Sequence, residues 1–157
     1  MTLPTALRRR IVSPDPETTR LVAAALARAA RPGDLICLRG DLGAGKTQFA
    51  KGFAEGLGVE ATVNSPSFVL MAEYEGRLPL FHLDLYRLVD AADVVAGGLL
   101  DERQETGATL IEWPERMAAA LPEGRLEVVF TGTGEDPRVL DIRAASPAYL
   151  RYLEALG

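Results

Sequence analysis

The chain has 157 residues, of which 48% are hydrophobic and 25% charged, values that are ordinary for one globular domain. Its 17 Lys+Arg and 22 Asp+Glu residues leave a net charge of -5, which argues against unaided tight binding of nucleic acid. One cysteine and one histidine exclude an intramolecular disulfide and a dedicated Cys/His zinc site, and no segment reaches about 18 apolar residues, so we expect a cytoplasmic protein that uses no membrane.

The first third of the chain predicts a strand, a helix and a second strand. Residues 8–12 (RRRIV) are expected to form a short strand or arm with solvated arginines. Asp15 is placed to cap a helix that has proline at its first position, and the alanine-rich residues 18–30 continue it. The apolar run 34–39 (DLICLR) suits a strand buried on both faces, with Cys37 as a small buried side chain.

The remaining segments alternate between expected helices and strands. A helix over about 46–57 precedes two strands, 68–74 and 78–86, which are joined by the turn 75–77. The later elements are a short helix from Asp90 interrupted by Gly97-Gly98, a strand at 109–113, a helix from Pro114 to Leu121, an antiparallel pair at 126–131 and 139–143, and a short helix capped by Ser146. This order predicts a single α/β domain over residues 1–157.

Residues 40–47 (GDLGAGKT) match the phosphate-binding pattern GxxxxGK[ST] at every defined position. The expected context agrees with the match, because a buried strand precedes the loop and a helix follows it. Glycines let backbone N–H groups turn towards phosphate oxygens, and the helix N-terminus attracts the same anion. Lys46 is expected beside the β- and γ-phosphates of ATP, and the hydroxyl of Thr47 on magnesium. The predicted nucleotide-binding residues of this segment are Asp41, Leu42, Gly43, Ala44, Gly45, Lys46, Thr47 and Gln48.

Asp84 is the first candidate for the carboxylate that completes a magnesium site. Alternate side chains of residues 80–86 (LFHLDLY) point to opposite faces of a strand, which places Asp84 on the same face as His82 and Tyr86. A carboxylate inside so apolar a run is costly to bury unless magnesium or another partner meets it. The alternative is a structural ion pair with Arg87 or a hydrogen bond to His82.

Glu112 is the second candidate, because it lies at the end of the other short apolar strand. We expect it to contact magnesium or to orient the attacking water, and the alternative is a surface or capping role. Trp113, the only tryptophan, is expected either against the nucleotide or in the core. The polar residues 62–67 form either a plain loop or a mobile switch segment that brings hydroxyls to the γ-phosphate.

Four stretches, taken together, resemble one family. They are GDLGAGKT (40–47), VNSPSF (63–68), HLDLYRL (82–88) and IEWPER (111–116), in an order and at a spacing similar to those of the bacterial TsaE (YjeE) ATPases of tRNA threonylcarbamoyladenosine biosynthesis. The phosphate loop alone is unspecific, whereas HxDLYRL followed by IEWPE is highly specific. The similarity spans nearly the whole chain.

The resemblance implies a P-loop NTPase fold of the α/β class, with a mixed, mostly parallel central sheet flanked by helices. It also implies ATP and Mg²⁺ as cofactors and the TsaB and TsaD proteins as partners, of which TsaD transfers the threonylcarbamoyl group to adenosine 37 of ANN-decoding tRNAs. Because the chain is acidic, we expect tRNA to be held mainly by the partners. The residues implied in catalysis are Lys46, Asp84 and Glu112, those in magnesium binding Thr47, Asp84 and Glu112, and those in the switch-like segment Ser65 and Ser67.

Two single residues and one glycine pair depart from the family pattern. Ser67 stands where the family usually has threonine, and it keeps the hydroxyl group. Gln48 replaces a commoner small or hydroxyl residue, and we expect it to touch nothing essential. Gly97-Gly98 makes its segment more flexible than the helix of the family.

Two other functions fit a phosphate loop. A small-molecule kinase would use the same loop, but it should carry an arginine-rich lid and an acceptor pocket, and the sequence shows no such lid segment. A nucleotide-gated binding module would use ATP only to select a conformation. The predicted function is therefore an ATP hydrolase, weak in isolation, in which Lys46 offsets phosphate charge and Glu112 acts on water.

Overall fold

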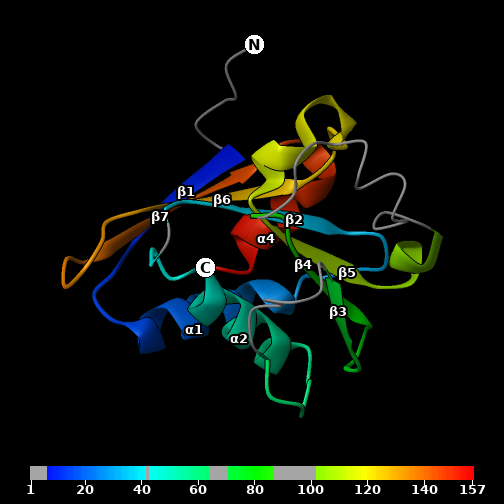
Figure 1. The fold of residues 1–157 in the computed structure, drawn as a ribbon, viewed down its shortest axis with the longest axis horizontal. Coiled ribbons are helices and arrows are strands. Elements are labelled where there is room, and N and C mark those ends of the chain that lie inside the picture. Colours follow the sequence, from blue (N-terminus) through cyan, green and yellow to red (C-terminus); the bar gives the residue numbers. More distant parts are fainter. Residues whose placement is uncertain (1–6, 42, 64–70, 87–101) are drawn as a thin grey trace.

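A seven-stranded mixed sheet organises the computed structural model, which describes residues 7–41, 43–63, 71–86 and 102–157 (Figure 1). Its strands are β1 (Arg8–Ser13), β2 (Leu35–Arg39), β3 (Met71–Tyr74), β4 (Leu80–Asp84), β5 (Ala108–Glu112), β6 (Leu126–Thr131) and β7 (Arg138–Ala144). They lie side by side in the order β1-β7-β6-β2-β5-β4-β3. Strands β6, β2, β5 and β4 run parallel, while β1, β7 and β3 are antiparallel to their neighbours. The expected mixed sheet with a parallel centre is confirmed.

Two hydrophobic cores lie on opposite faces of this sheet. Helices α1 (Pro16–Ala27), α2 (Lys46–Gly56) and α4 (Leu150–Glu154) pack with Ile36, Leu38 and Leu110 on one face. Figure 1 shows α1 and α2 beside each other below the sheet. The other face carries a smaller core that includes Cys37, Phe81 and Ile111. Alternate residues of β2, β4 and β5 therefore serve different cores, as the period of a strand requires.

Short 3-10 helices complete the described elements: η2 (Glu102–Thr106), η3 (Pro114–Ala120) and η4 (Pro147–Tyr149). The helix expected from Pro114 is thus a tighter 3-10 helix, and the final helix begins as one before it continues as α4. Ser146 precedes η4 as expected, but its side chain makes no capping hydrogen bond. No helix within the described ranges has both the length and the apolar character needed to cross a bilayer.

Helix α1 begins as the sequence predicts and ends one turn early. The Asp15 carboxylate accepts a 2.7 Å hydrogen bond from the amide of Thr18, and Pro16 occupies the first helical position. Beyond Ala27 the chain makes shorter-range bonds, such as the 3.0 Å bond from the amide of Ala29 to Leu26 O, which tighten the last turn. The predicted end at residue 30 was therefore wrong by three residues.

Other expectations concern the end of β4, the burial of Cys37 and segments that the structure does not describe. Strand β4 ends at Asp84 rather than at residue 86, although the amide of Leu85 still donates a 3.1 Å hydrogen bond to Glu112 O of the neighbouring strand. Cys37 is fully buried, as expected, and this burial raises the pKa of its thiol to about 12, which favours the protonated form. Residues 64–70, which include Ser65 and Ser67 of the expected switch-like segment, the segment from Asp90 with its two glycines, and Arg87 lie outside the described residues.

Helices α1 and α2 approach each other closely because glycine faces the contact. A Cβ atom added at Gly52 would lie 2.2 Å from Arg20 O, far inside van der Waals contact. We therefore expect Gly52→Ala to lower the free energy of unfolding by about 1–3 kcal/mol, measured by chemical denaturation. Glu55→Ala, at an exposed position of the same helix, is the matched control and should change stability little. Equal stability of both variants would contradict this packing.

Candidate active site

The phosphate loop leaves the end of β2 and turns sharply into α2. Gly43 and Gly45 have φ angles of 80° and 103°, which glycine adopts without strain. Gly40 is required for another reason, because an added Cβ would lie 2.9 Å from Phe130 Cβ. Gly45 is the N-cap of α2 and has no side chain to cap it, in contrast to Asp15 of α1. The first amides of α2 are thus available to an anion.

Lys46, the first residue of α2, carries the positive charge of the loop. Its side chain is only 5% exposed, and its Nζ donates a 2.7 Å hydrogen bond to Gly40 O. The same Nζ lies 3.8 Å from the centroid of the Trp113 ring. Burial lowers the pKa of Lys46, while the nearby Glu112 carboxylate acts in the opposite direction.

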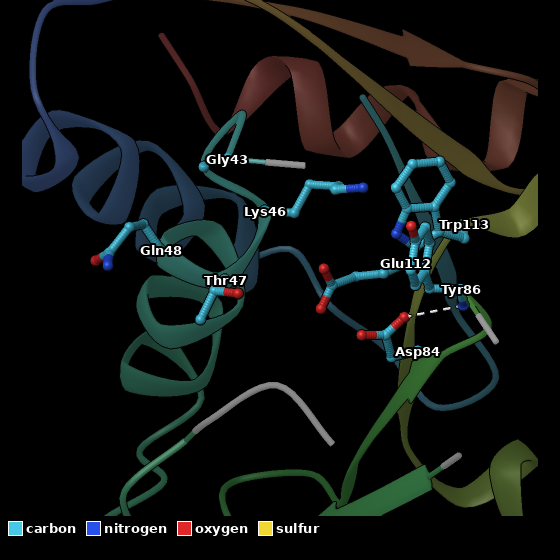
Figure 2. Close-up of a pocket in the computed structure, with 9 residues that line it drawn as sticks. Gly43, Lys46, Thr47, Gln48, Asp84, Tyr86, Glu112 and Trp113 are labelled. Carbon is cyan, nitrogen blue, oxygen red and sulfur yellow. Dashed lines mark hydrogen bonds between the residues drawn. The ribbon is translucent and has the colours of Figure 1, made fainter. Parts of the chain in front are cut away.

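Two carboxylates face the loop from adjacent parallel strands. Asp84 ends β4 and Glu112 ends β5, and the register pairs them directly. Figure 2 shows both carboxylates on the side of the site opposite Thr47 and Lys46. Asp84 Oδ1 also accepts a 3.1 Å hydrogen bond from the amide of Tyr86. The strand alternation predicted for this segment is thus confirmed, because Phe81, on the opposite face, belongs to the other core.

Glu112 has a buried partner. Its side chain is 4% exposed, and its Oε2 lies 2.7 Å from Nε2 of His82, which is fully buried. The sequence had suggested a hydrogen bond from His82 to Asp84 on the same strand as one alternative. The structure pairs His82 with the carboxylate of the neighbouring strand instead.

A cavity of about 320 Å³ lies between the loop and the two strand ends. It brings together most of the predicted site residues and adds Tyr86, and its lining is Gly43, Gly45, Lys46, Thr47, Gln48, Asp84, Tyr86, Glu112 and Trp113. Asp41 is exposed and outside this lining, Ala44 is buried in the larger core, and Leu42 lies outside the described residues. Tyr86 could have been found from the sequence, since it shares the strand face of Asp84.

Comparison with known proteins identifies the family of this chain. The family model described as "Threonylcarbamoyl adenosine biosynthesis protein TsaE" matches residues 13–140. The chain belongs to the TsaE family. A protein of Bacillus subtilis (strain 168) named "tRNA threonylcarbamoyladenosine biosynthesis protein TsaE" is 43% identical over 144 residues, which cover 91% of this chain and 90% of the relative. A protein of the same name from Treponema pallidum is 42% identical over 114 residues, 73% of this chain and 84% of the relative.

A solved structure agrees with the fold of this TsaE family member. The crystal structure of Bacillus subtilis YdiB superposes with a TM-score of 0.78 at 37% sequence identity, covering 95% of this chain and 93% of that chain. The P-loop NTPase-like fold expected from the sequence is therefore confirmed.

The donor set of this TsaE site fits a magnesium ion that is shared with phosphates. The described part of the chain contains no cluster of three or more His, Cys, Asp or Glu residues able to hold a metal alone. Magnesium in nucleotide sites is usually held by one or two protein oxygens, with phosphates and water completing its octahedron. Thr47 and Asp84, on facing sides of the cavity, provide such oxygens.

A second cavity of about 360 Å³ adjoins the same loop. Gly43, Gly45 and Gln48 line both cavities, while Gly134 of the β6–β7 connection and Arg138, the first residue of β7, line only the second. The remaining lining residues come from the end of β1, the start of α1, the connection between them and the same β6–β7 connection: Ser13, Pro14, Asp15, Pro16, Thr19, Glu135 and Asp136. No sequence motif marks these segments, so the second cavity could not be predicted from the sequence.

Two polar contacts fix the loop where the cavities meet. Arg138 donates hydrogen bonds of 3.1 Å to Gly43 O and 3.0 Å to Gly134 O, so it joins the phosphate loop to the β6–β7 connection. Arg20 of α1 donates a 2.6 Å hydrogen bond to Oε1 of Gln48. Gln48 therefore lies at the wall of both cavities with its side chain held by α1.

The fluorescence of Trp113 can report whether a nucleotide binds in the cavity. The Trp113 φ angle of 61° is rare for a residue with a large side chain. Its ring lies against Lys46 and against the ring of Tyr86, whose centroid is 4.9 Å from its own. Because Trp113 is the only tryptophan, we expect its fluorescence to change when ATP or ADP draws Lys46 onto phosphate. The change should saturate with nucleotide and be absent from Trp113→Phe. A constant spectrum while calorimetry records binding would place the nucleotide elsewhere.

Proposed function

We propose that this chain is a cytoplasmic, magnesium-dependent ATPase that supports the threonylcarbamoyl modification of adenosine 37 in ANN-decoding tRNAs, together with TsaB and TsaD. The relatives from Bacillus subtilis and Treponema pallidum, both named as tRNA threonylcarbamoyladenosine biosynthesis proteins, support the tRNA modification. The observation that carries the ATPase activity is the arrangement of uncapped α2 amides and Lys46 opposite the paired strand ends Asp84 and Glu112.

The loop amides and four side chains of the cavity have proposed roles in hydrolysis. The amides of the loop and the Lys46 ammonium would bind the β- and γ-phosphates and offset charge that develops on them. The Thr47 hydroxyl and the Asp84 carboxylate would hold magnesium, which supplies charge neutralisation between those phosphates when it is bound. Glu112, the more buried carboxylate, would also reach the metal, or orient the attacking water and accept its proton.

We further propose that the nucleoside occupies the second cavity. This follows from the shared wall, because Gly43, Gly45 and Gln48 line both spaces and a triphosphate on the loop would extend from one to the other. One ATP molecule would then occupy both cavities, with its phosphates in the first and its nucleoside in the second.

The test is modification of tRNA in a bacterial strain depleted of its own TsaE. A plasmid copy of this chain should restore threonylcarbamoyladenosine in digested tRNA, measured by mass spectrometry, and the Lys46→Ala copy should not. In parallel, the purified chain mixed with TsaB and TsaD should release phosphate from ATP without any acceptor substrate. No restoration by the unchanged chain at normal expression would contradict the role in tRNA modification. Phosphate release only with an added small-molecule acceptor would indicate a kinase instead.

A further inference from the structure

The buried contact between His82 and Glu112 places an imidazole directly behind one of the two carboxylates of the cavity. Strands β4 and β5 are parallel, and the register sets Asp84 opposite Glu112 and His82 opposite Leu110. His82 therefore lies two residues before Asp84 on the same strand face, further from the cavity. Glu112 contacts His82 on its core side and lines the cavity on its other side.

The hydrogen bonding around His82 indicates which of its nitrogens carries the hydrogen. Nε2 lies 2.7 Å from Glu112 Oε2, whereas Nδ1 has no hydrogen-bond partner among the described residues. A buried N–H without an acceptor is rarer than a buried acceptor without a donor. The hydrogen is therefore assigned to Nε2, which donates it to the carboxylate.

A glutamate side chain has three rotatable bonds and loses orientation easily unless a partner holds it. His82 is 0% exposed on a strand inside the sheet, so its ring is held in place. Its hydrogen bond therefore holds Oε2 of Glu112 in place as well. With Oε2 fixed, the direction in which the carboxylate faces the cavity is fixed as well. Removing a hydrogen bond that orients a functional carboxylate typically lowers activity or metal affinity by about 10- to 100-fold.

We propose that His82 is a positioning residue that holds the Glu112 carboxylate in the orientation needed for ATP hydrolysis. This inference rests on the proposed ATPase function. His82 itself transfers no proton, because it does not line the cavity and reaches it only through Glu112.

The experiment compares His82→Gln with His82→Asn. The amide nitrogen of glutamine can stand close to the place of Nε2, whereas that of asparagine stands close to Nδ1, where none of the described residues offers a partner. We expect His82→Asn to lower kcat about 10- to 100-fold with little change in the KM for ATP, and His82→Gln to restore kcat towards the parent value. In a Glu112→Gln background, His82→Asn should cause no further loss, because the two residues act through one contact.

A second measurement needs no turnover. His82 is the only histidine, so the imidazole signals in an NMR spectrum of the nucleotide-free protein belong to it alone. We expect a proton on Nε2 that exchanges slowly with water and whose signal moves in Glu112→Gln. A proton on Nδ1 would overturn the assigned contact.

Three results would overturn the positioning role. One is unchanged kcat in both His82 variants. The second is an equal loss in both that follows a lowered melting temperature, which would mean that His82 only packs. The third is a further loss when His82→Asn is added to Glu112→Gln. Failure of the proposed function would be recognised separately, because the parent protein with TsaB and TsaD would then release no phosphate before any variant is compared.

Discussion

Lys46→Ala is expected to abolish ATP hydrolysis and to weaken the binding of an ATP analogue by about 10- to 100-fold. A hydrogen bond between a charged donor and its partner contributes about 1.5–3 kcal/mol, which corresponds to that change in the dissociation constant. The loss in turnover should be larger than the loss in affinity, because charge on the phosphates grows in the transition state. Calorimetric titration with a non-hydrolysable ATP analogue and an assay of phosphate release measure the two effects.

Lys51→Ala is the matched control for this experiment. Lys51 lies in the same helix α2, is partly exposed, and does not line the cavity of the phosphate loop. It should bind and hydrolyse nucleotide as the parent does. If Lys46→Ala bound the analogue as tightly as Lys51→Ala does, the loop would not be the phosphate site.

Glu112→Gln is expected to lower kcat by about 10²- to 10⁴-fold while the affinity for nucleotide changes little. Such a factor is typical when a group that assists proton transfer from water is lost, and glutamine keeps the shape and one oxygen for His82. Asp84→Asn should act differently, because it removes a proposed magnesium ligand. Its main effect should be a higher magnesium concentration needed for half-maximal hydrolysis.

Glu115→Gln separates these effects from a general loss of negative charge near the loop. Glu115 is exposed and forms an ion pair of 3.1 Å with Arg39, outside the cavity lining. We expect it to hydrolyse ATP at the parent rate. Unchanged hydrolysis in Glu112→Gln, with loss of binding to TsaB and TsaD, would instead favour a nucleotide-gated module without catalysis.

The central part of the fold could be predicted because its signals are local. The apolar run of β2 followed by a complete phosphate-loop pattern predicts strand, loop and helix together. Alternation along β4 was enough to separate Asp84 and Tyr86 from the residues of the smaller core. These two signals account for most of the cavity that the structure shows.

Features that depend on contacts between distant segments could not be predicted. The pairing of His82 with Glu112 requires the register between β4 and β5, which no pattern in one strand contains. The contact of Arg138 with Gly43 joins residues that are 95 positions apart. Helix ends were displaced for a simpler reason, since the last turn of α1 tightens under competing shorter-range hydrogen bonds.

A crystal structure of the chain with a non-hydrolysable ATP analogue and Mn²⁺, whose anomalous signal locates the metal, tests the central claim most directly. We predict phosphates on the amides that begin α2, Nζ of Lys46 moved from Gly40 O onto a phosphate oxygen, and the metal between the Thr47 hydroxyl and the Asp84 carboxylate. An analogue bound away from the loop, or a metal that neither Thr47 nor Asp84 contacts, would contradict it.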